Sequence, residues 1–217
     1  MQPDDVIAAA YDRWARQYDS DRNPTRDLDA LVLRRAGLRV HGRRVLELGC
    51  GTGKNTAWLS EQRPAELVAM DFSAGMLGQA RERLGDAARL LRQDLREPWP
   101  LPAGCMDLVL GNLVLEHIEQ LPPLFAEAAR VLAPGGELYL CELHPYRQWA
   151  GGQAHFIDAD SQAVVQVPAF THALSDYINP LIAAGFRLLH VGEWLEAAAP
   201  PGAKPRLVSF HARRETT

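Results

Sequence analysis

A glycine-rich turn and two carboxylates stand where a nucleoside ligand could be bound. The segment Gly49-Cys-Gly-Thr-Gly53 follows a short apolar run that contains Glu47, and Asp71 comes later in the chain. Glycines 49 and 51 allow a ligand to approach the backbone closely, and a carboxylate roughly 20 residues further on can accept hydrogen bonds from both ribose hydroxyls. Between a strand and a helix, this turn predicts a nucleoside-binding βαβ unit.

The spacing of the turn separates it from a dinucleotide site. Here the pattern is G-x-G-x-G, whereas the dinucleotide pattern G-x-G-x-x-G leads a pyrophosphate onto a helix N-terminus. Glu47 beside the turn would repel pyrophosphate but would suit a ligand that carries an ammonium and a sulfonium. An NAD(P)-dependent reductase is the nearest alternative enzyme. A catalytically silent cofactor-binding partner subunit also stays open, because binding motifs alone do not prove turnover.

Short apolar runs that alternate with amphipathic segments predict a parallel sheet covered by helices on both faces. Residues 23–37 and 73–85 have helical spacing, with Asn23 and Ser73 as caps and Pro24 at a first helical position. Five runs read as strands, at 45–48, 67–70, 89–92, 106–110 and 137–141. Acid or amide residues follow these strands, at the sheet edge where ligands of open parallel sheets bind.

The alternation changes after the fifth strand. Two β-prone stretches flank a turn and predict a hairpin insertion, at 154–157 and 163–167. A helix is expected at about 175–184, although Pro180 favours a later start at Asn179. Two more strands are expected, at 186–194 and 206–212.

Five motifs occur in order from about residue 40 to residue 145. They are VLELGCGTG at 45–53, VAMDFSAGML at 68–77, RQDL at 92–95, DLVLGNLVLEH at 107–117 and ARVLAPGGE at 129–137. Together they resemble the successive signatures of class I S-adenosylmethionine-dependent methyltransferases. The resemblance implies an α/β fold, with a Rossmann-like, doubly wound, mostly parallel seven-stranded sheet and an antiparallel last strand.

The same resemblance implies how a single domain over residues 1–217 is organised. An N-terminal helical lid is expected in residues 1–40 and the cofactor-binding half in 41–145. A substrate cap containing the hairpin follows in 146–172, and a C-terminal helix with the last two strands occupies 173–217.

The cofactor implied is S-adenosyl-L-methionine, with S-adenosyl-L-homocysteine as the product. From the methionine end through the ribose and adenine to the sulfonium, the implied contacts are Glu47, Gly49, Gly51, Asp71, Phe72, Met76, Asp94, Leu95, Asn112 and Leu113. The stretch 11–19 is similar to a lid helix from which Tyr18 can reach the cofactor. Tyr11, Trp14 and Tyr18 read equally well as the packing stripe of one helix.

Methyl transfer from a sulfonium requires mainly alignment, because the leaving group is already good. Proximity can supply on the order of 7 to 11 kcal/mol of the barrier reduction, and a lid excludes competing water. A base is needed only if the acceptor arrives protonated; the candidates are His144, which follows the fifth strand, and His117. Candidate substrate contacts are Tyr146, His172 and Arg147, which could clamp a carboxylate or phosphate or stand on the surface. We expect O- or N-methylation of a small molecule.

Composition limits the partners. Hydrophobic residues make up 47% and charged residues 23% of the 217 residues, which is typical of a globular domain. No apolar run is long enough for a bilayer span, and no secretory signal is recognisable, so a cytoplasmic location without membrane attachment is expected. A net charge of −4 disfavours nucleic acid, although RNA methylation stays open. Three distant cysteines match neither a metal site nor a disulfide framework, so no metal is expected. The sequence leaves the oligomeric state open.

Overall fold

Seven strands form one sheet in the order β3-β2-β1-β4-β5-β9-β8 in the computed structural model, which describes residues 3–196 and 198–215. Both neighbours of β9 pair with it in antiparallel fashion, and all other neighbours are parallel. The expected sheet with an antiparallel last strand is therefore confirmed. The strands are β1 Arg44–Leu48, β2 Glu66–Asp71, β3 Arg89–Arg92, β4 Met106–Asn112, β5 Leu132–Leu143, β8 Phe186–Trp194 and β9 Leu207–Arg214.

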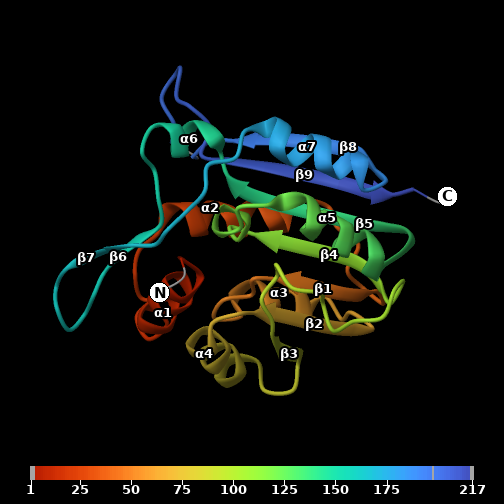
Figure 1. Ribbon diagram of the computed structural model, residues 1–217, viewed down its shortest axis with the longest axis horizontal. Helices are drawn as coiled ribbons and strands as arrows, with labels where there is room; N and C mark the ends of the chain where they lie inside the picture. The colour runs from red at the N-terminus through yellow and green to blue at the C-terminus, as the bar shows by residue number, and fades with distance from the viewer. Residues whose placement is uncertain (1–2, 197, 216–217) are drawn as a thin grey trace.

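Helices cover both faces of this sheet (Figure 1). On one face, α5 (Leu121–Val131) and α7 (Leu174–Ala183) bury Phe125 and Tyr177 against the larger core cluster. On the other face lie α2 (Pro24–Arg35), α3 (Lys54–Glu61) and α4 (Ala74–Leu84). The central strands are therefore buried on both sides, which explains their continuous apolar sequences.

Two helix starts follow from the predicted caps. Asn23 accepts hydrogen bonds from the backbone N–H groups of Thr25 and Arg26 at 3.0 and 3.1 Å. Ser73 accepts from the backbone N–H of Met76 at 3.0 Å. These bonds satisfy donors that a helix N-terminus leaves free, so both predicted starts are confirmed.

The helix expected at about 175–184 is confirmed as α7, and the alternative start at Asn179 is wrong. This helix begins at Leu174 and contains Pro180. Asp176 in its first turn accepts a hydrogen bond from the backbone N–H of Ala173 at 2.8 Å. Burial of Tyr177 and Leu181 on the apolar side offsets the backbone hydrogen bond that the proline cannot donate.

The N-terminal segment and the hairpin lie together beyond the carboxyl ends of the parallel strands (Figure 1). Helix α1 (Pro3–Trp14) ends before Tyr18, so only residues 11–14 of the expected lid helix at 11–19 are helical and the rest forms turns. Within the expected lid of residues 1–40, α2 instead packs on the sheet through Leu28, Val32 and Leu33.

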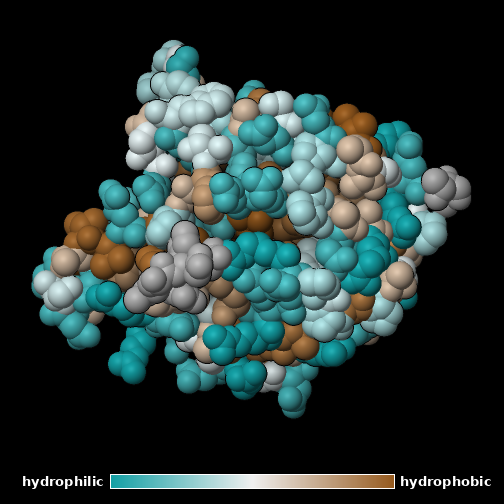
Figure 2. All heavy atoms as spheres, viewed as in Figure 1, coloured by the Kyte–Doolittle hydropathy of each residue, from teal (hydrophilic) through white to brown (hydrophobic). Residues whose placement is uncertain are grey.

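The predicted hairpin is confirmed as two antiparallel strands, β6 (His155–Ile157) and β7 (Val164–Gln166). A short helix α6 (Pro145–Trp149), which the sequence did not indicate, precedes it. Figure 2 shows a hydrophobic patch over the hairpin, where the side chains of Ile157 and Val164 are exposed. In the described part of the chain, every helix is too short or too polar to cross a bilayer.

Candidate functional site

A cavity opens at the carboxyl ends of β1, β2 and β4, under the N-terminal segment. All of the predicted cofactor contacts except Glu47 line it. The lining residues from the prediction are Tyr18, Gly49, Gly51, Asp71, Phe72, Met76, Asp94, Leu95, Asn112 and Leu113. The strand order brings them together because β1 lies between β2 and β4. The chain connection reverses its direction across the sheet at this point, where open α/β sheets bind ligands.

Asp71 fixes the glycine turn. One carboxylate oxygen accepts a hydrogen bond from the backbone N–H of Gly51 at 2.8 Å, and the other accepts from Ser73 at 2.9 Å. Each oxygen keeps a lone pair that can accept a ribose hydroxyl. Burial raises the pKa of Asp71 to about 6, against the lowering effect of these backbone donors. The carboxylate is therefore ionised above about pH 6, as ribose binding requires.

Asn112 presents a free acceptor to the same cavity. Its amide nitrogen donates to Asp29 at 2.5 Å, while its side-chain oxygen is buried without a hydrogen-bond partner among the described residues. A buried oxygen without a partner is costly, which indicates that a ligand donor completes its bonding. With the open glycine turn and Asp71, this oxygen fits a ligand that carries hydroxyls and an ammonium group.

Glu47 does not reach the cavity. It is only 2% exposed, and it accepts a hydrogen bond from Thr56 of α3 at 2.5 Å beneath the glycine turn. Burial raises its pKa to about 8. The carboxyl is therefore mostly neutral at pH 7, so the expected repulsion of pyrophosphate by Glu47 has no support in the structure.

The raised pKa of Glu47 makes stability depend on pH. Unfolded chains ionise Glu near pH 4.3, whereas the folded chain keeps this proton up to about pH 8. The folded state therefore binds more protons between these values, and this group lowers stability progressively as the pH rises through that range. Glu47→Gln removes the ionisation and retains an acceptor for Thr56. We expect it to stabilise the protein by on the order of 3 kcal/mol at pH 8 and by much less at pH 5.

Thermal unfolding of both proteins at pH 5, 6.5 and 8 measures this difference. Glu61→Gln, on the exposed side of α3, is the matched control and should leave the unfolding temperature almost unchanged. A stabilisation of Glu47→Gln that does not grow with pH would contradict the assignment of a buried, protonated carboxyl.

Phe72, Met76 and Leu95, which were expected beside the adenine, also line the cavity. Asp94, expected at the adenine amino edge, also lines the cavity and forms an ion pair with Arg96 at 2.5 Å. Hydrogen bonds from Arg96 lower the pKa of Asp94. An ionised carboxylate there can still accept a further donor, since each oxygen has two lone pairs.

The N-terminal segment covers the cavity through aromatic side chains. Tyr11 and Tyr18 line it, and Tyr11 forms a 2.7 Å hydrogen bond with Nε2 of His117. Nδ1 of His117 lies 2.9 Å from the carbonyl oxygen of Pro168, which can only accept, so Nδ1 carries the proton and the Tyr11 hydroxyl donates to Nε2. The ring of Trp14 stacks on Phe156 of β6. The aromatic stripe is therefore both packing surface and cavity wall.

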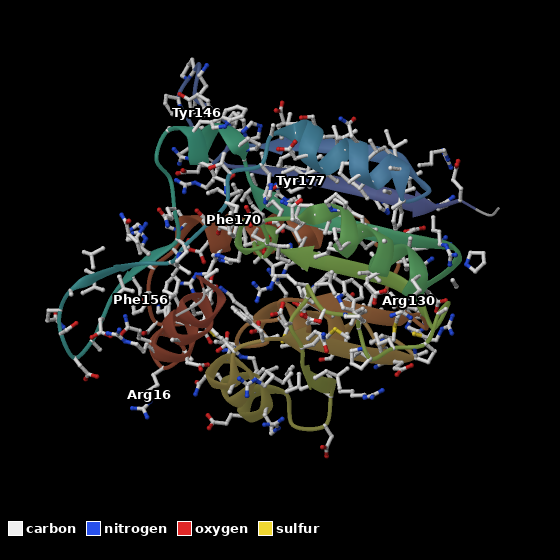
Figure 3. All side chains as sticks on the ribbon, in the orientation of Figure 1. Arg16, Arg130, Tyr146, Phe156, Phe170 and Tyr177 are labelled. Atoms are coloured by element: carbon white, nitrogen blue, oxygen red, sulfur yellow. The ribbon has the colours of Figure 1, made fainter. Side chains whose placement is uncertain are left out.

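His144, His172 and Tyr146 line neither this cavity nor its neighbour. His144 caps α6, since Nδ1 accepts from the backbone N–H of Tyr146 at 3.1 Å and Nε2 donates to Glu193 at 2.9 Å. His172 is buried and donates to the carbonyl of Ile118 at 2.9 Å. Figure 3 shows Tyr146 on α6, on the far side from α1. Of the two candidate bases, only His117 is brought to the cofactor cavity.

A second cavity of about 910 Å³ adjoins the first. Tyr11, Tyr18 and Leu113 line both. Its other walls come from the chain after α1, the start of α2, the segment after α6 and the hairpin, and they include Arg147. Residues of the expected cap therefore line a cavity next to the first one.

Sequence reasoning missed several cavity residues. Gln93, Val114 and Ile118 also line the first cavity, and Glu116 lines the second. Val114, Glu116 and Ile118 lie on or beside the 3-10 turn η1 (Leu115–His117) that follows β4. Glu116 inside the apolar stretch LVLEHI was a signal that could have found this site, because an acidic side chain is seldom buried unless it is paired.

Comparisons with known proteins agree with this geometry. The family model described as a methyltransferase domain matches residues 46–140. An uncharacterized methyltransferase of Emericella nidulans is 30% identical and covers 83% of this chain and 75% of its own length. A malonyl-[acyl-carrier protein] O-methyltransferase of Halorhodospira halophila is 36% identical, over 64% of this chain and 48% of its own length. The chain thus spans about half the length of that relative.

A solved S-adenosylmethionine-dependent methyltransferase from Mesorhizobium loti has the same fold. It superposes with a TM-score of 0.70 at 26% identity and covers 85% of this chain and 96% of its own. Together with the family match and the relatives, this similarity excludes the reductase alternative. The chain belongs to the class I S-adenosylmethionine-dependent methyltransferases, and S-adenosylmethionine is its cofactor.

Proposed function

We propose that this enzyme methylates an oxygen or nitrogen atom of a small molecule bound in the second cavity. The observation that carries the proposal is the junction of the two cavities at Tyr11, Tyr18 and Leu113. An acceptor held at this junction can reach a cofactor in the first cavity without crossing bulk water. S-adenosylmethionine supplies a methyl group activated on a sulfonium, so the protein contributes mainly alignment and the exclusion of water.

The charges of the second cavity favour an acceptor with an anionic group. Its lining contains only two carboxylates, Asp21 and Glu116, against the arginines Arg22, Arg26, Arg147 and Arg206. Glu196 forms ion pairs with both Arg147 and Arg206, which leaves one positive charge in that trio uncompensated. A carboxylate or phosphate of the acceptor would compensate this positive charge through charge-assisted hydrogen bonds to the arginines.

The N-terminal segment is suited to act as the water-excluding lid. Its hydrogen bond from Tyr11 to His117 closes the cofactor side. On the acceptor side, Arg13 pairs with Asp158 of the hairpin turn at 2.7 Å, and Gln17 donates to the carbonyl of Ile157 at 2.6 Å. These contacts join lid and hairpin, so opening for substrate entry would have to break them.

A transfer assay tests the proposal. The purified enzyme is incubated with S-adenosylmethionine carrying an isotope-labelled methyl group and with the small-molecule fraction of a cell extract. We expect a labelled low-mass product with the label on oxygen or nitrogen. Parallel incubations with protein, acyl-carrier and RNA fractions test the other acceptor classes. Label found only on one of these macromolecules would overturn the small-molecule assignment.

A further inference from the structure

Glu116 occupies an unusual place between the two cavities. It lies on η1, directly before His117, which lines the cofactor cavity. Glu116 itself lines the second cavity, although its side chain is only 8% exposed. An acidic side chain therefore lies on the wall of the second cavity, next in sequence to a residue that lines the first.

The surroundings leave this carboxylate incompletely bonded. Its Oε1 is 3.8 Å from Nε2 of His117, which is beyond hydrogen-bond length, and its Oε2 has no partner among the described residues. Gln148 beside it donates to the carbonyl of Phe170 at 3.2 Å, and a side-chain hydrogen bond from Gln148 to Glu116 partly counters the rise in the pKa of Glu116 that burial causes. The side-chain oxygen of Gln148 is likewise buried and without a described partner. Two neighbouring oxygens therefore need donors.

A second buried acid, Glu142, lies close to Glu116. Glu142 at the end of β5 accepts hydrogen bonds from the backbone N–H groups of Val114 and Leu115. Burial raises the pKa of Glu142 and of Glu116, and the two acids repel each other. No lysine or arginine in the described ranges forms an ion pair with either. A cationic group with several N–H donors would satisfy the free oxygens and would favour the ionised form of these acids over the protonated form.

We propose that Glu116 binds the methyl acceptor as an ammonium ion and takes its proton, so that the methylated atom is a nitrogen. This inference rests on the proposed function and narrows it to an amine that carries a carboxylate or phosphate for the arginines of the same cavity. The ammonium gives one proton to the Glu116 carboxylate. The freed nitrogen lone pair forms a bond to the methyl carbon as the carbon–sulfur bond breaks, and that electron pair stays on sulfur. Glu116 then releases the proton to water.

The sulfonium of the cofactor is the competing cation for this carboxylate. The two roles differ in binding, because S-adenosylhomocysteine lacks the positive charge. If Glu116 contacted the sulfonium, Glu116→Gln would lower the affinity for S-adenosylmethionine and leave the affinity for S-adenosylhomocysteine unchanged. If it serves the acceptor, calorimetry should give affinities for both compounds close to those of the wild type.

The test compares Glu116→Gln with Glu119→Gln, an exposed acid on the same loop. Both are assayed for isotope transfer to the small-molecule fraction and to a panel of amines and alcohols that carry a carboxylate or phosphate. We expect the wild type and Glu119→Gln to label an amine nitrogen. Glu116→Gln should be slower by about 100-fold or more, as for loss of a general base. Its melting temperature should not fall, since a buried charge is removed.

The pH profile separates proton transfer from mere packing. Glu116→Gln should recover rate as the pH rises and solvent deprotonates the amine, so its deficit shrinks at high pH. The other ionisable groups that face Glu116 are Tyr11, His117, Glu142 and Tyr177. A wild-type rate in Glu116→Gln, a pH-independent deficit, label on oxygen, or selective loss of S-adenosylmethionine affinity would each overturn the inference. No low-mass product with the wild type would overturn the proposed function and this inference with it.

Discussion

Asp71→Asn should lower the affinity for S-adenosylmethionine by about 100-fold or more, because two charge-assisted hydrogen bonds to the ribose are each worth roughly 1.5–3 kcal/mol. The backbone N–H groups of Gly51 and Ser73 donate to the two carboxylate oxygens at 2.8 and 2.9 Å. In the variant, the amide nitrogen replaces one of these oxygens and cannot accept the bond. The glycine turn would therefore lose one of its supports. Titration calorimetry with S-adenosylmethionine and S-adenosylhomocysteine should show the loss for both, since they share the ribose.

Asp86→Asn is the matched control, because Asp86 is exposed after α4 and away from the cavity. Circular dichroism of both variants verifies that they are folded. The wild-type affinity should also fall as the pH drops through about 6, where Asp71 gains a proton in the free enzyme. If the cofactor affinity of Asp71→Asn were within about threefold of the wild-type value, the assignment of the ribose hydroxyls to this carboxylate would be wrong.

Gly49→Ala should cause the largest loss of stability. A Cβ at Gly49 would lie 2.4 Å from Cγ2 and 2.8 Å from Cβ of Val114, and the backbone φ there is +64°. The left-handed conformation costs roughly 1–2 kcal/mol for alanine, and overpacking adds roughly 1–3 kcal/mol. We expect the melting temperature to fall by about 5–15 °C.

Two further variants separate the clash from the backbone strain. Gly37→Ala has a similar φ of +68° and nothing within 4 Å of the added Cβ, so it should lose only about 2–4 °C. Val114→Ala in the Gly49→Ala background removes the clashing methyl groups and should recover part of the stability. Equal losses for Gly49→Ala and Gly37→Ala, or no recovery in the double variant, would contradict the close packing of the turn against η1.

Local signals in the sequence predicted most strands of the sheet and the N-caps of two helices. Asn23 and Ser73 cap helices because their short polar side chains can reach the free N–H groups of the next turn. The hairpin could also be predicted, since both its strands and its turn are local features. The expected range of about 175–184 for α7 was correct, whereas the alternative start that Pro180 suggested was wrong, because burial of Tyr177 and Leu181 against the distant sheet stabilises the earlier start.

The candidate site was predictable where strand order alone positions a residue. Asp71 and Asn112 end strands that flank β1, so any sheet with this order brings them to one edge. Glu47 is also at a strand end, yet its side chain turns beneath the loop to Thr56. Which way a side chain points at a strand end depends on the helix packed against it, and a sequence pattern does not contain that information.

The family, the sheet and the cofactor could be identified from the chain alone, because glycine conformation, strand periodicity and the order of polar strand ends are local properties. Which ionisable groups line the cavities depends on the folded molecule. It placed His144 as a helix cap and Glu116 between the cavities. The physical reason is that burial and hydrogen-bond partners come from α1, α6 and the hairpin, which are distant in sequence and meet only when the chain is folded.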